Sequence, residues 1–186
     1  MSLTFAHPPA IRDVEKRIAQ GLRHIGQRFS SNERSTLVGP VPIYSLAQKP
    51  LKSRGQSRWA ASGQWRGLVM AGEFPIATIQ AGEPFDGRST SVRGEESARA
   101  FHASLLKAVE IGSATDKNFQ VRFVVIPGAF LTAVWLYGRR SIFIPTRIGP
   151  GARPKLKEYS TENFARLINR LRQKVKQSTS PKTAYR

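Results

Sequence analysis

Strand-like segments rich in Val, Ile and Phe fall into two groups of three along this chain, and several of them are separated by only a few turn residues. The segments are 41–46, 65–71 and 74–81 in the first group, and 119–126, 130–137 and 141–144 in the second. Turns as short as these join antiparallel strands, because parallel strands need a long crossover. The spacing therefore predicts an antiparallel or mixed sheet of about five to six strands.

Three further segments carry apolar residues at intervals of three and four, which is the spacing of an amphipathic helix. They are residues 9–29, 95–111 and 161–176. The inner face expected for the second helix consists of Ala98, Phe101, Leu105 and Val109. Gly112 is expected just after that helix, where glycine is common, and Ser160 or Thr161 is expected to cap the third. The sequence thus predicts three amphipathic helices.

These elements indicate an α+β domain with its helices on one face of the sheet. Their order also allows a diverged duplication of a helix-plus-three-strand unit. We expect a single domain over residues 9–176, a flexible N-terminus over 1–8 and a disordered basic tail over 177–186. Pro42 predicts an edge or starting position for its strand, because proline cannot donate to a sheet. Residues 47–63 are expected to form a mobile loop.

Positive charge is the most lopsided feature of the composition. The chain has 30 Lys and Arg against 12 Asp and Glu, for a formal charge of +18. Residues 1–62 carry 10 basic and 3 acidic side chains and residues 125–186 carry 13 and 2, whereas the residues between them are neutral. Such an excess repels itself in a compact state, and a polyanion such as nucleic acid would relieve that repulsion. The alternative is that the charges only solubilise the chain.

Three groups of residues are candidates for contacts with nucleic acid. The first lies in the expected loop and comprises Lys49, Lys52, Arg54, Arg58 and Trp59. The second comprises Arg139, Arg140, Arg147, Arg153, Lys155 and Lys157. The third lies on the last helix and comprises Arg166, Arg170 and Lys174. An indole beside guanidinium groups can stack on a base while the cations hold phosphates, although the same pattern fits an arginine packed on a structural tryptophan.

No residue pattern predicts catalysis, a metal site or a cofactor. The chain has no Cys, and its three histidines, His7, His24 and His102, lack the spacing of metal ligands. We expect His102 to be a partly buried helix residue, with a catalytic role as the less frequent alternative. Glu83 and Asp86 share a loop that could hold a divalent ion, but ordinary turn chemistry explains them as well.

The sequence thus favours a basic, non-enzymatic protein that binds nucleic acid or another polyanion with little sequence specificity. A second hypothesis is a protein–protein interaction or adaptor component of a bacterial assembly or of a mobile-element system, in which charge steers association. A third is a toxin-like nuclease that uses His102. We find no targeting signal and no apolar segment long enough to span a membrane, so a cytoplasmic location is expected.

Overall fold

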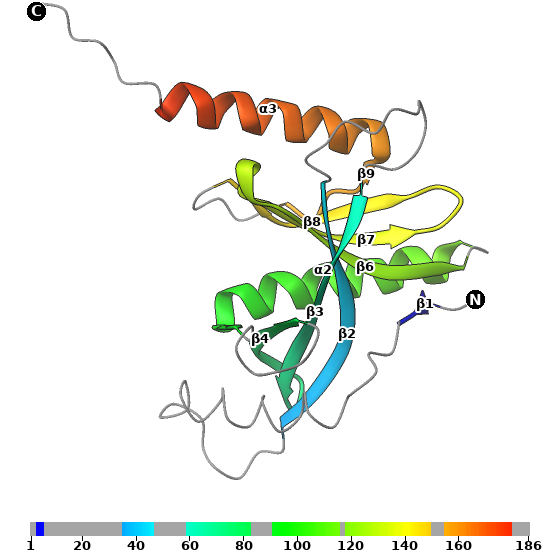
Figure 1. The fold of residues 1–186 in the computed structure, drawn as a ribbon. Helices are drawn as coiled ribbons and strands as arrows, with labels where there is room; N and C mark the ends of the chain where they lie inside the picture. Colours follow the sequence, from blue (N-terminus) through cyan, green and yellow to red (C-terminus); the bar gives the residue numbers. More distant parts are fainter. Residues whose placement is uncertain are drawn as a thin grey trace, which may run out of the picture.

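The computed structural model describes residues 3–5, 35–46, 59–82, 91–115, 118–149 and 155–179. These residues form a mixed α+β fold in which two helices pack on a nine-stranded sheet (Figure 1). The long strands are β2 (Ser35–Leu46), β3 (Trp59–Ala71), β4 (Phe74–Gly82), β6 (Phe119–Ile126), β7 (Leu131–Tyr137) and β8 (Ile142–Ile148). The short strands are β1 (Leu3–Thr4), β5 (Ser91–Arg93) and β9 (Tyr159–Ser160). The helices are α2 (Glu95–Ala114) and α3 (Thr161–Thr179), and a 3-10 turn, η1 (Pro127–Ala129), follows β6.

The sheet is built from two antiparallel halves that meet at a parallel pair. Its strand order is β5-β4-β3-β2-β6-β7-β8-β9, and β1 pairs with β6 beside this path. The central strands β2 and β6 run parallel, whereas the strands within each half are antiparallel. Each half runs outward through three long strands to a short strand that leads into a helix. This order is compatible with two related halves, and the duplication itself stays a prediction.

The two helices lie on opposite faces of the sheet, so the expectation of helices on one face is wrong. Figure 1 shows the half formed by β6, β7 and β8 between α3 above and α2 below. Successive residues of a strand point to opposite faces. On β7, Val134 and Leu136 accordingly pack with α2, while Ala133 and Trp135 pack with α3. Strand β7 is therefore buried on both faces.

The contact between α2 and the sheet is the larger apolar core. Phe101 is buried and meets Phe123 edge to face at 5.3 Å between ring centroids. The buried residues of α2 are Ala98, Phe101, Ser104, Leu105, Ala108, Ile111 and Gly112. Val109, in contrast, is 48% exposed, so its predicted place on the inner face is wrong. The helix also continues past the predicted end at Ile111, which places Gly112 within it, against Leu3 of β1.

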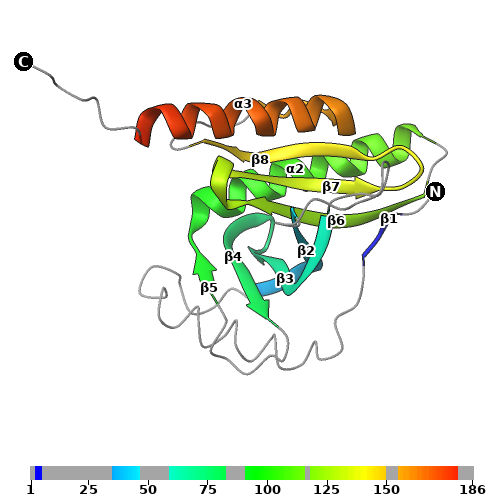
Figure 2. The ribbon, with the colours of Figure 1, turned by 45° about the horizontal axis from the view of Figure 1, so that its top comes forward.

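The contact between α3 and the sheet is a cluster of aromatic rings. Phe164 stacks on Phe143 with 4.2 Å between ring centroids, and Phe143 in turn stacks on Trp135 at 5.5 Å. Leu167 and Ile168 complete the buried side of α3. The Ser160 hydroxyl accepts a hydrogen bond from the Asn163 amide at 3.3 Å, which confirms the predicted cap. The predicted apolar face of this helix is therefore the side that packs on the sheet, and the helix runs along β8 (Figure 2).

The number of strands differs from the prediction because three of them are only two or three residues long. Strands β1, β5 and β9 are too short to show alternation in the sequence. Strand β3 also begins at Trp59, inside the predicted loop 47–63. Pro42 lies in an internal strand rather than at an edge, beside a register irregularity, and β6 pairs with β2 only from Ile43 to Ser45. Pro42 is in register with Trp65 of β3 but lies just before the residues that pair with β6, so the missing donor is not placed within the β2–β6 ladder.

A few predictions fall outside the part of the chain that the structure describes. They are the first helix (9–29), the flexible N-terminus over most of 1–8, most of the loop 47–63, and the tail beyond Thr179. Helix α3 itself ends at Thr179, three residues later than predicted. Within the described residues, neither helix has the length and apolar character that crossing a membrane requires.

One charged side chain interrupts the apolar contact between the sheet and α2. Arg66 of β3 is only 6% exposed, and its Nη2 donates to the hydroxyls of Thr78, at 3.0 Å, and Ser97, at 2.8 Å. Its guanidinium carbon lies 4.7 Å from the centre of the Phe123 ring. Its Nε is buried without a hydrogen-bond partner. Burial, followed by the nearby charge of Arg93, lowers the pKa of Arg66 to about 10.

Candidate nucleic-acid interface

The outward side of α3 carries a continuous set of basic residues. The apolar residues of the helix face the sheet, which leaves the other positions exposed: Arg166, Arg170, Arg172, Lys174 and Lys176. Arg166, Arg170 and Lys174 follow one another at four-residue intervals, so they form one ridge along the helix, which we call the α3 ridge. Neighbours in this ridge are about 6 Å apart along the helix axis.

The α3 ridge lacks acidic partners. Within the described residues, none of Arg166, Arg170 and Lys174 forms an ion pair. Like charges four residues apart destabilise a helix by about 0.2–0.5 kcal/mol for each pair. The chain thus retains repulsive pairs on its surface, and an anionic partner would turn them into favourable contacts.

Glu158 could neutralise the start of α3, but it is engaged with the other helix. Lys107 of α2 lies 2.8 Å from Oε1 of Glu110 and 3.4 Å from Oε1 of Glu158. The hydrogen bond with Glu110 raises the pKa of Lys107, and Glu158 acts in the same direction. One of the two acidic residues in the C-terminal third of the chain is therefore directed toward α2 rather than toward the ridge.

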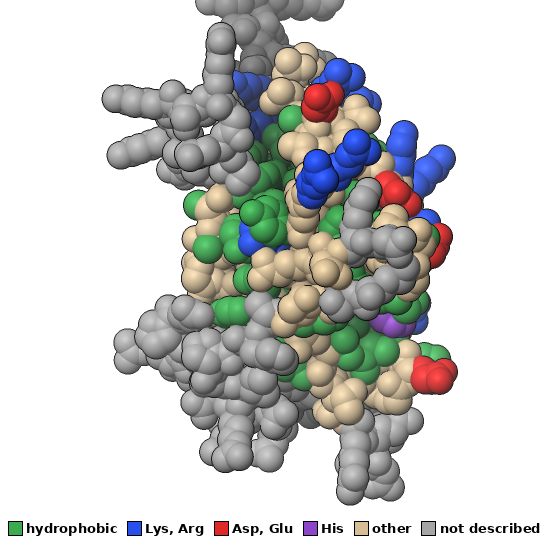
Figure 3. Space-filling view, turned by 90° about the vertical axis from the view of Figure 1, so that its right-hand side faces the viewer, with side chains coloured by type: hydrophobic (Ala, Val, Ile, Leu, Met, Phe, Trp, Pro, Cys, Tyr) green, Lys and Arg blue, Asp and Glu red, His purple; other side chains and the backbone are tan. Residues whose placement is uncertain are grey.

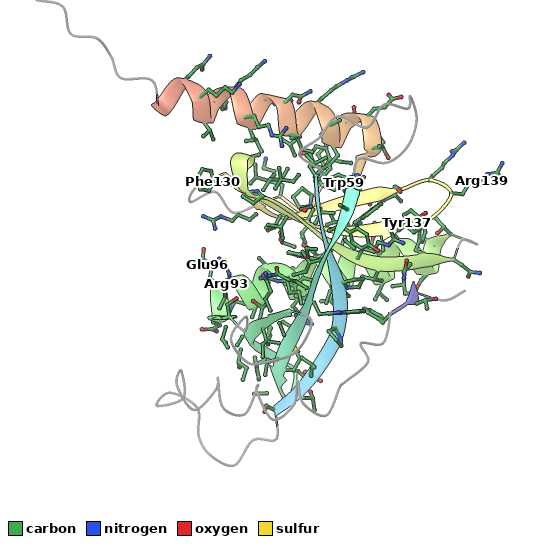
Figure 4. All side chains as sticks on the ribbon, viewed as in Figure 1. Trp59, Arg93, Glu96, Phe130, Tyr137 and Arg139 are labelled. Atoms are coloured by element: carbon green, nitrogen blue, oxygen red, sulfur yellow. The ribbon has the colours of Figure 1, made fainter. Side chains whose placement is uncertain are left out.

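Arg139 and Arg140 lie at the same end of the sheet as the start of α3. They occupy the turn between β7 and β8, and both are exposed. Strand β9, which leads into α3, pairs with the first residues of β8 after this turn. Figure 4 shows Arg139 projecting from the tip of the hairpin, and Figure 3 shows several Lys and Arg side chains, with a few Asp and Glu side chains among them, in the upper part of this end of the molecule. Lys155 and Lys157 are exposed in the segment that precedes β9.

Arg147 lies apart from the hairpin arginines. It is exposed near the far end of β8, where its Nε donates to the Gly149 carbonyl at 3.4 Å. About five residues of extended strand separate it from Arg140, at about 3.4 Å for each residue. The predicted second group of contacts is therefore divided between the two ends of β8. Lys49, Lys52, Arg54, Arg58 and Arg153 fall outside the described residues.

Trp59 is part of the packed structure rather than of a loop. It is the first residue of β3, and its ring centroid lies 5.7 Å from those of Trp135 and Phe143 and 6.2 Å from that of Phe164. The ring is only half-buried, but its position is fixed by these contacts. Trp59 is therefore better described as a structural tryptophan than as a base-stacking residue in a mobile loop.

A second group of aromatic side chains encloses Arg122 on β6. The guanidinium carbon of Arg122 lies 3.5 Å from the centre of the Tyr137 ring and 4.5 Å from that of Tyr44. The Trp135 ring centre is 5.0 Å away. Both Nε and Nη2 donate to Oε1 of Gln120, at 2.9 and 2.7 Å. Burial lowers the pKa of Arg122, while the two tyrosines act in the opposite direction.

This Arg122 cluster presents a fixed aromatic ring to solvent. Tyr137 is 42% exposed, and its ring is held by Arg122 on one side and by Trp135 at an edge-to-face distance of 5.2 Å. The chain continues directly from Tyr137 into the turn with Arg139 and Arg140. A rigid ring beside cations can stack on a nucleobase while the cations contact phosphates. The arrangement combines base stacking and phosphate contact, the two functions that the sequence predicts for Trp59 and the arginines near it.

Sequence reasoning missed the Arg122 cluster because its members come from three strands. Arg122 is paired across the sheet with Trp135, and Gln120 with Tyr137. The usable signal is the alternation within residues 119–126, where Gln120 and Arg122 are the polar positions of one strand face. That pattern identifies a polar strip, but it does not say which aromatic residues lie beside it.

The described residues contain no constellation for hydrolysis or metal binding. His102 is half-buried and makes no hydrogen bond or ion pair with any residue that the structure describes. No group of three or more His, Asp or Glu side chains within the described ranges could hold a metal ion. Glu83 and Asp86 lie outside them. The nuclease hypothesis therefore gains no support from His102.

Comparison with known proteins adds no relationship. No family model, curated protein or solved structure matches this chain.

Proposed function

We propose that this chain binds nucleic acid through the α3 ridge, the hairpin arginines and the Arg122 cluster, with little sequence specificity and without catalysing a reaction. The observation that carries the proposal is the row of exposed Arg166, Arg170 and Lys174 without acidic partners among the described residues. Helix α3 carries five Lys and Arg against a single acidic residue, Glu162, in its first turn, whereas a helix that served only solubility would mix the two signs more evenly. Phosphates are the anions that such a row of cations meets most often, because each neutralised phosphate releases a condensed counterion.

The geometry of the ridge favours contacts along a phosphate backbone. Its cations recur about every 6 Å along the helix axis. Phosphates of one strand of a duplex recur at about 3.4 Å along the duplex axis, so alternate phosphates have a similar repeat. Contacts of this kind fix the position of a nucleic acid without reading its bases, which is why we expect low specificity.

The experiment is a salt titration of binding to a fluorescently labelled oligonucleotide. For the triple variant Arg166→Gln/Arg170→Gln/Lys174→Gln, three lost phosphate contacts reduce the slope of log K against log salt by about 2 on single strands and about 3 on duplex DNA. Glutamine keeps the helix propensity close to that of the residues it replaces. Affinity at low salt should fall in parallel for unrelated sequences.

A matched control distinguishes the ridge from net charge. Arg99→Gln removes one exposed helical arginine from α2, on the opposite face of the sheet, and Arg170→Gln removes one from the ridge. The proposal expects weaker binding only for the ridge variant. Equal loss in both variants indicates a general charge effect, and no binding of the unaltered protein to DNA or RNA at low salt removes the proposal altogether.

A further inference from the structure

The buried charge of Arg66 has no carboxylate partner within the described residues. Its Nη2 contacts only the neutral hydroxyls of Thr78 and Ser97, and its Nε contacts no acceptor. The three ion pairs of the described structure involve other residues. A buried cation ordinarily has an anionic partner, because removal of its hydration shell is otherwise uncompensated. The aromatic contacts with Phe101 and Phe123 offset only part of that loss.

The second feature at this place is the start of α2. Ser97, the acceptor of the Arg66 hydrogen bond, belongs to the first turn of that helix. The N-cap residue is Gly94, which supplies no side-chain acceptor, so the first amides of α2 have no side-chain cap. The start of a helix carries partial positive charge and favours an anion. The Ser97 and Ala98 amides donate to the Gly94 carbonyl at 3.1 and 3.2 Å, and Arg66 directs a full positive charge at this helix start, whose first turn also carries Glu95 and Glu96.

Among the residues that the structure describes, the charged groups around this helix start do not pair with Arg66. Arg93 is exposed beside it and adds positive charge. Glu95 is held by Arg99 one turn along α2, on the exposed surface. Glu96 is exposed and forms no ion pair with any described residue. Figure 4 shows Arg93 and Glu96 at this end of α2.

The hydroxyl groups at the site still have a proton to donate. Thr78 and Ser97 each accept from Arg66, and their oxygens lie 3.3 Å apart, so one hydroxyl can donate to the other. The proton of the remaining hydroxyl is then unused. Thr78 is fully buried, whereas Ser97 is partly exposed, so an incoming group would meet the Ser97 hydroxyl first. Guanidinium, hydroxyl and helix amides together are the donors that a phosphate group uses.

We infer that Arg66, Ser97 and the first turn of α2 form an oxyanion site, and that its ligand is inorganic phosphate or the phosphate group of a small molecule. The site lies between the sheet and α2, on the face opposite the α3 ridge. It is thus independent of the proposed nucleic-acid interface. Binding of the anion would supply the partner that the buried guanidinium lacks.

Urea unfolding in phosphate and in chloride, at equal ionic strength and pH, tests the inference. A ligand that binds only the folded protein lowers the unfolding equilibrium constant about tenfold at a concentration about ten times its Kd. Phosphate also stabilises proteins without a site, by exclusion from their surface. Arg66→Met therefore serves as the reference, since methionine can fill the space without a charge. The inference expects a phosphate-specific shift of the urea midpoint in the unaltered protein that is absent from this variant.

Several outcomes would overturn the inference. Equal shifts in the unaltered protein and in Arg66→Met indicate general salt exclusion. A second outcome is that phosphate does not shift the urea midpoint of the unaltered protein but does shift that of the double variant Glu83→Gln/Asp86→Asn. This result indicates that a carboxylate of the chain itself occupies the place beside Arg66. If Arg66→Met does not fold, Ser97→Ala replaces it as the reference, and a phosphorus NMR titration measures binding directly. Absence of binding in that titration contradicts the inference.

Two further experiments identify the form of the ligand and distinguish this site from the α3 ridge. In the first, a nucleoside monophosphate replaces inorganic phosphate. If the monophosphate shifts the urea midpoint at a lower concentration than phosphate does, the ligand is a phosphate ester; otherwise it is the free ion. Either result supports the site. The triple ridge variant Arg166→Gln/Arg170→Gln/Lys174→Gln should keep the full phosphate response. Loss of the response in that variant places the anion on α3 and overturns the inference, whatever the outcome for nucleic acid.

Discussion

Replacement of Arg66 by methionine should stabilise the protein in chloride buffer at neutral pH. The pKa of Arg66 lies below its ordinary value, at about 10 in the fold, because of its burial and the nearby charge of Arg93. At about 1.36 kcal/mol for each pH unit, that difference corresponds to about 3 kcal/mol of unfavourable free energy for the charged form. Methionine removes this penalty and retains much of the apolar volume of the arginine side chain.

The loss of the Arg66 hydrogen bonds in this variant acts in the opposite direction and lowers the free energy of unfolding. Its two bonds to hydroxyl groups contribute about 1 kcal/mol each. The hydroxyls of Thr78 and Ser97 are already 3.3 Å apart, so they can pair with one another once the guanidinium is absent. The net gain is about 1 kcal/mol, at the lower end of the range for apolar replacement of buried ions. In a chain of this size it corresponds to a rise in Tm of about 2–4 °C.

Urea unfolding followed by tryptophan fluorescence measures the effect, with Arg99→Met as the exposed control, which should change stability by less than about 0.5 kcal/mol. The pH dependence of the free energy of unfolding tests the same reasoning. Below pH 10 Arg66 is protonated in both the folded and the unfolded chain. Above pH 10, and up to the ordinary pKa of arginine, only the unfolded chain keeps the proton, so the stability of the unaltered protein rises relative to Arg66→Met. The advantage of the variant should therefore shrink above pH 10.

A clear loss of stability in Arg66→Met would refute this reasoning. Removal of one partner of a buried ion pair costs about 3–5 kcal/mol, because the other charge is left buried. A loss of that size would mean that the guanidinium has a carboxylate partner among the residues outside the described ranges.

Further predictions concern the aromatic clusters and the surface ion pairs. Tyr137→Leu should weaken binding to single-stranded DNA by about 1–3 kcal/mol, since one stacked base is lost, while the slope with salt stays the same. The control is Phe74→Leu, which alters another exposed aromatic residue at the start of β4, and equal effects would contradict a specific role for Tyr137. Phe164→Ala should destabilise the fold by about 3–5 kcal/mol in urea unfolding, because a fully buried ring stacked on Phe143 is removed. Lys107→Met should leave the urea midpoint nearly unchanged, because its partners Glu110 and Glu158 are exposed, and a large loss would show that this contact holds β9 in place.

The long strands could be predicted from the sequence because each contains its own signal. Alternation in residues 119–126 and the apolar run before Tyr137 locate β6 and β7, and the short Gly72-Glu73 turn locates the β3–β4 hairpin. The two- and three-residue strands have no such signal, since they exist only by pairing with a neighbour. Their presence follows from tertiary contact rather than from local pattern.

The errors in the helices and the site have the same physical origin. Val109 follows Leu105 at a helical spacing, but the inner face of α2 continues through Ala108 instead, where the sheet lies. Helices α2 and α3 cover opposite faces of the sheet. The alternation of residues along a strand shows that two faces exist, but it does not say which face each helix covers. The basic character of α3 was readable directly, because a single helix carries it. The Arg122 cluster was not, because it joins residues from β2, β6 and β7.

The brevity of the outermost strands limits aggregation. Strands β5 and β9 close the two ends of the sheet, and they are three and two residues long. Each gives way within a residue to a helix, so β5 itself offers a row of three residues and β9 a row of two, and they cover only residues 78–80 of β4 and 142–143 of β8. Long, flat edges invite a second molecule to add its own strand. Within the described residues the outermost strands thus add little edge of their own, and an insertion that lengthened β5 or β9 would favour end-to-end polymerisation.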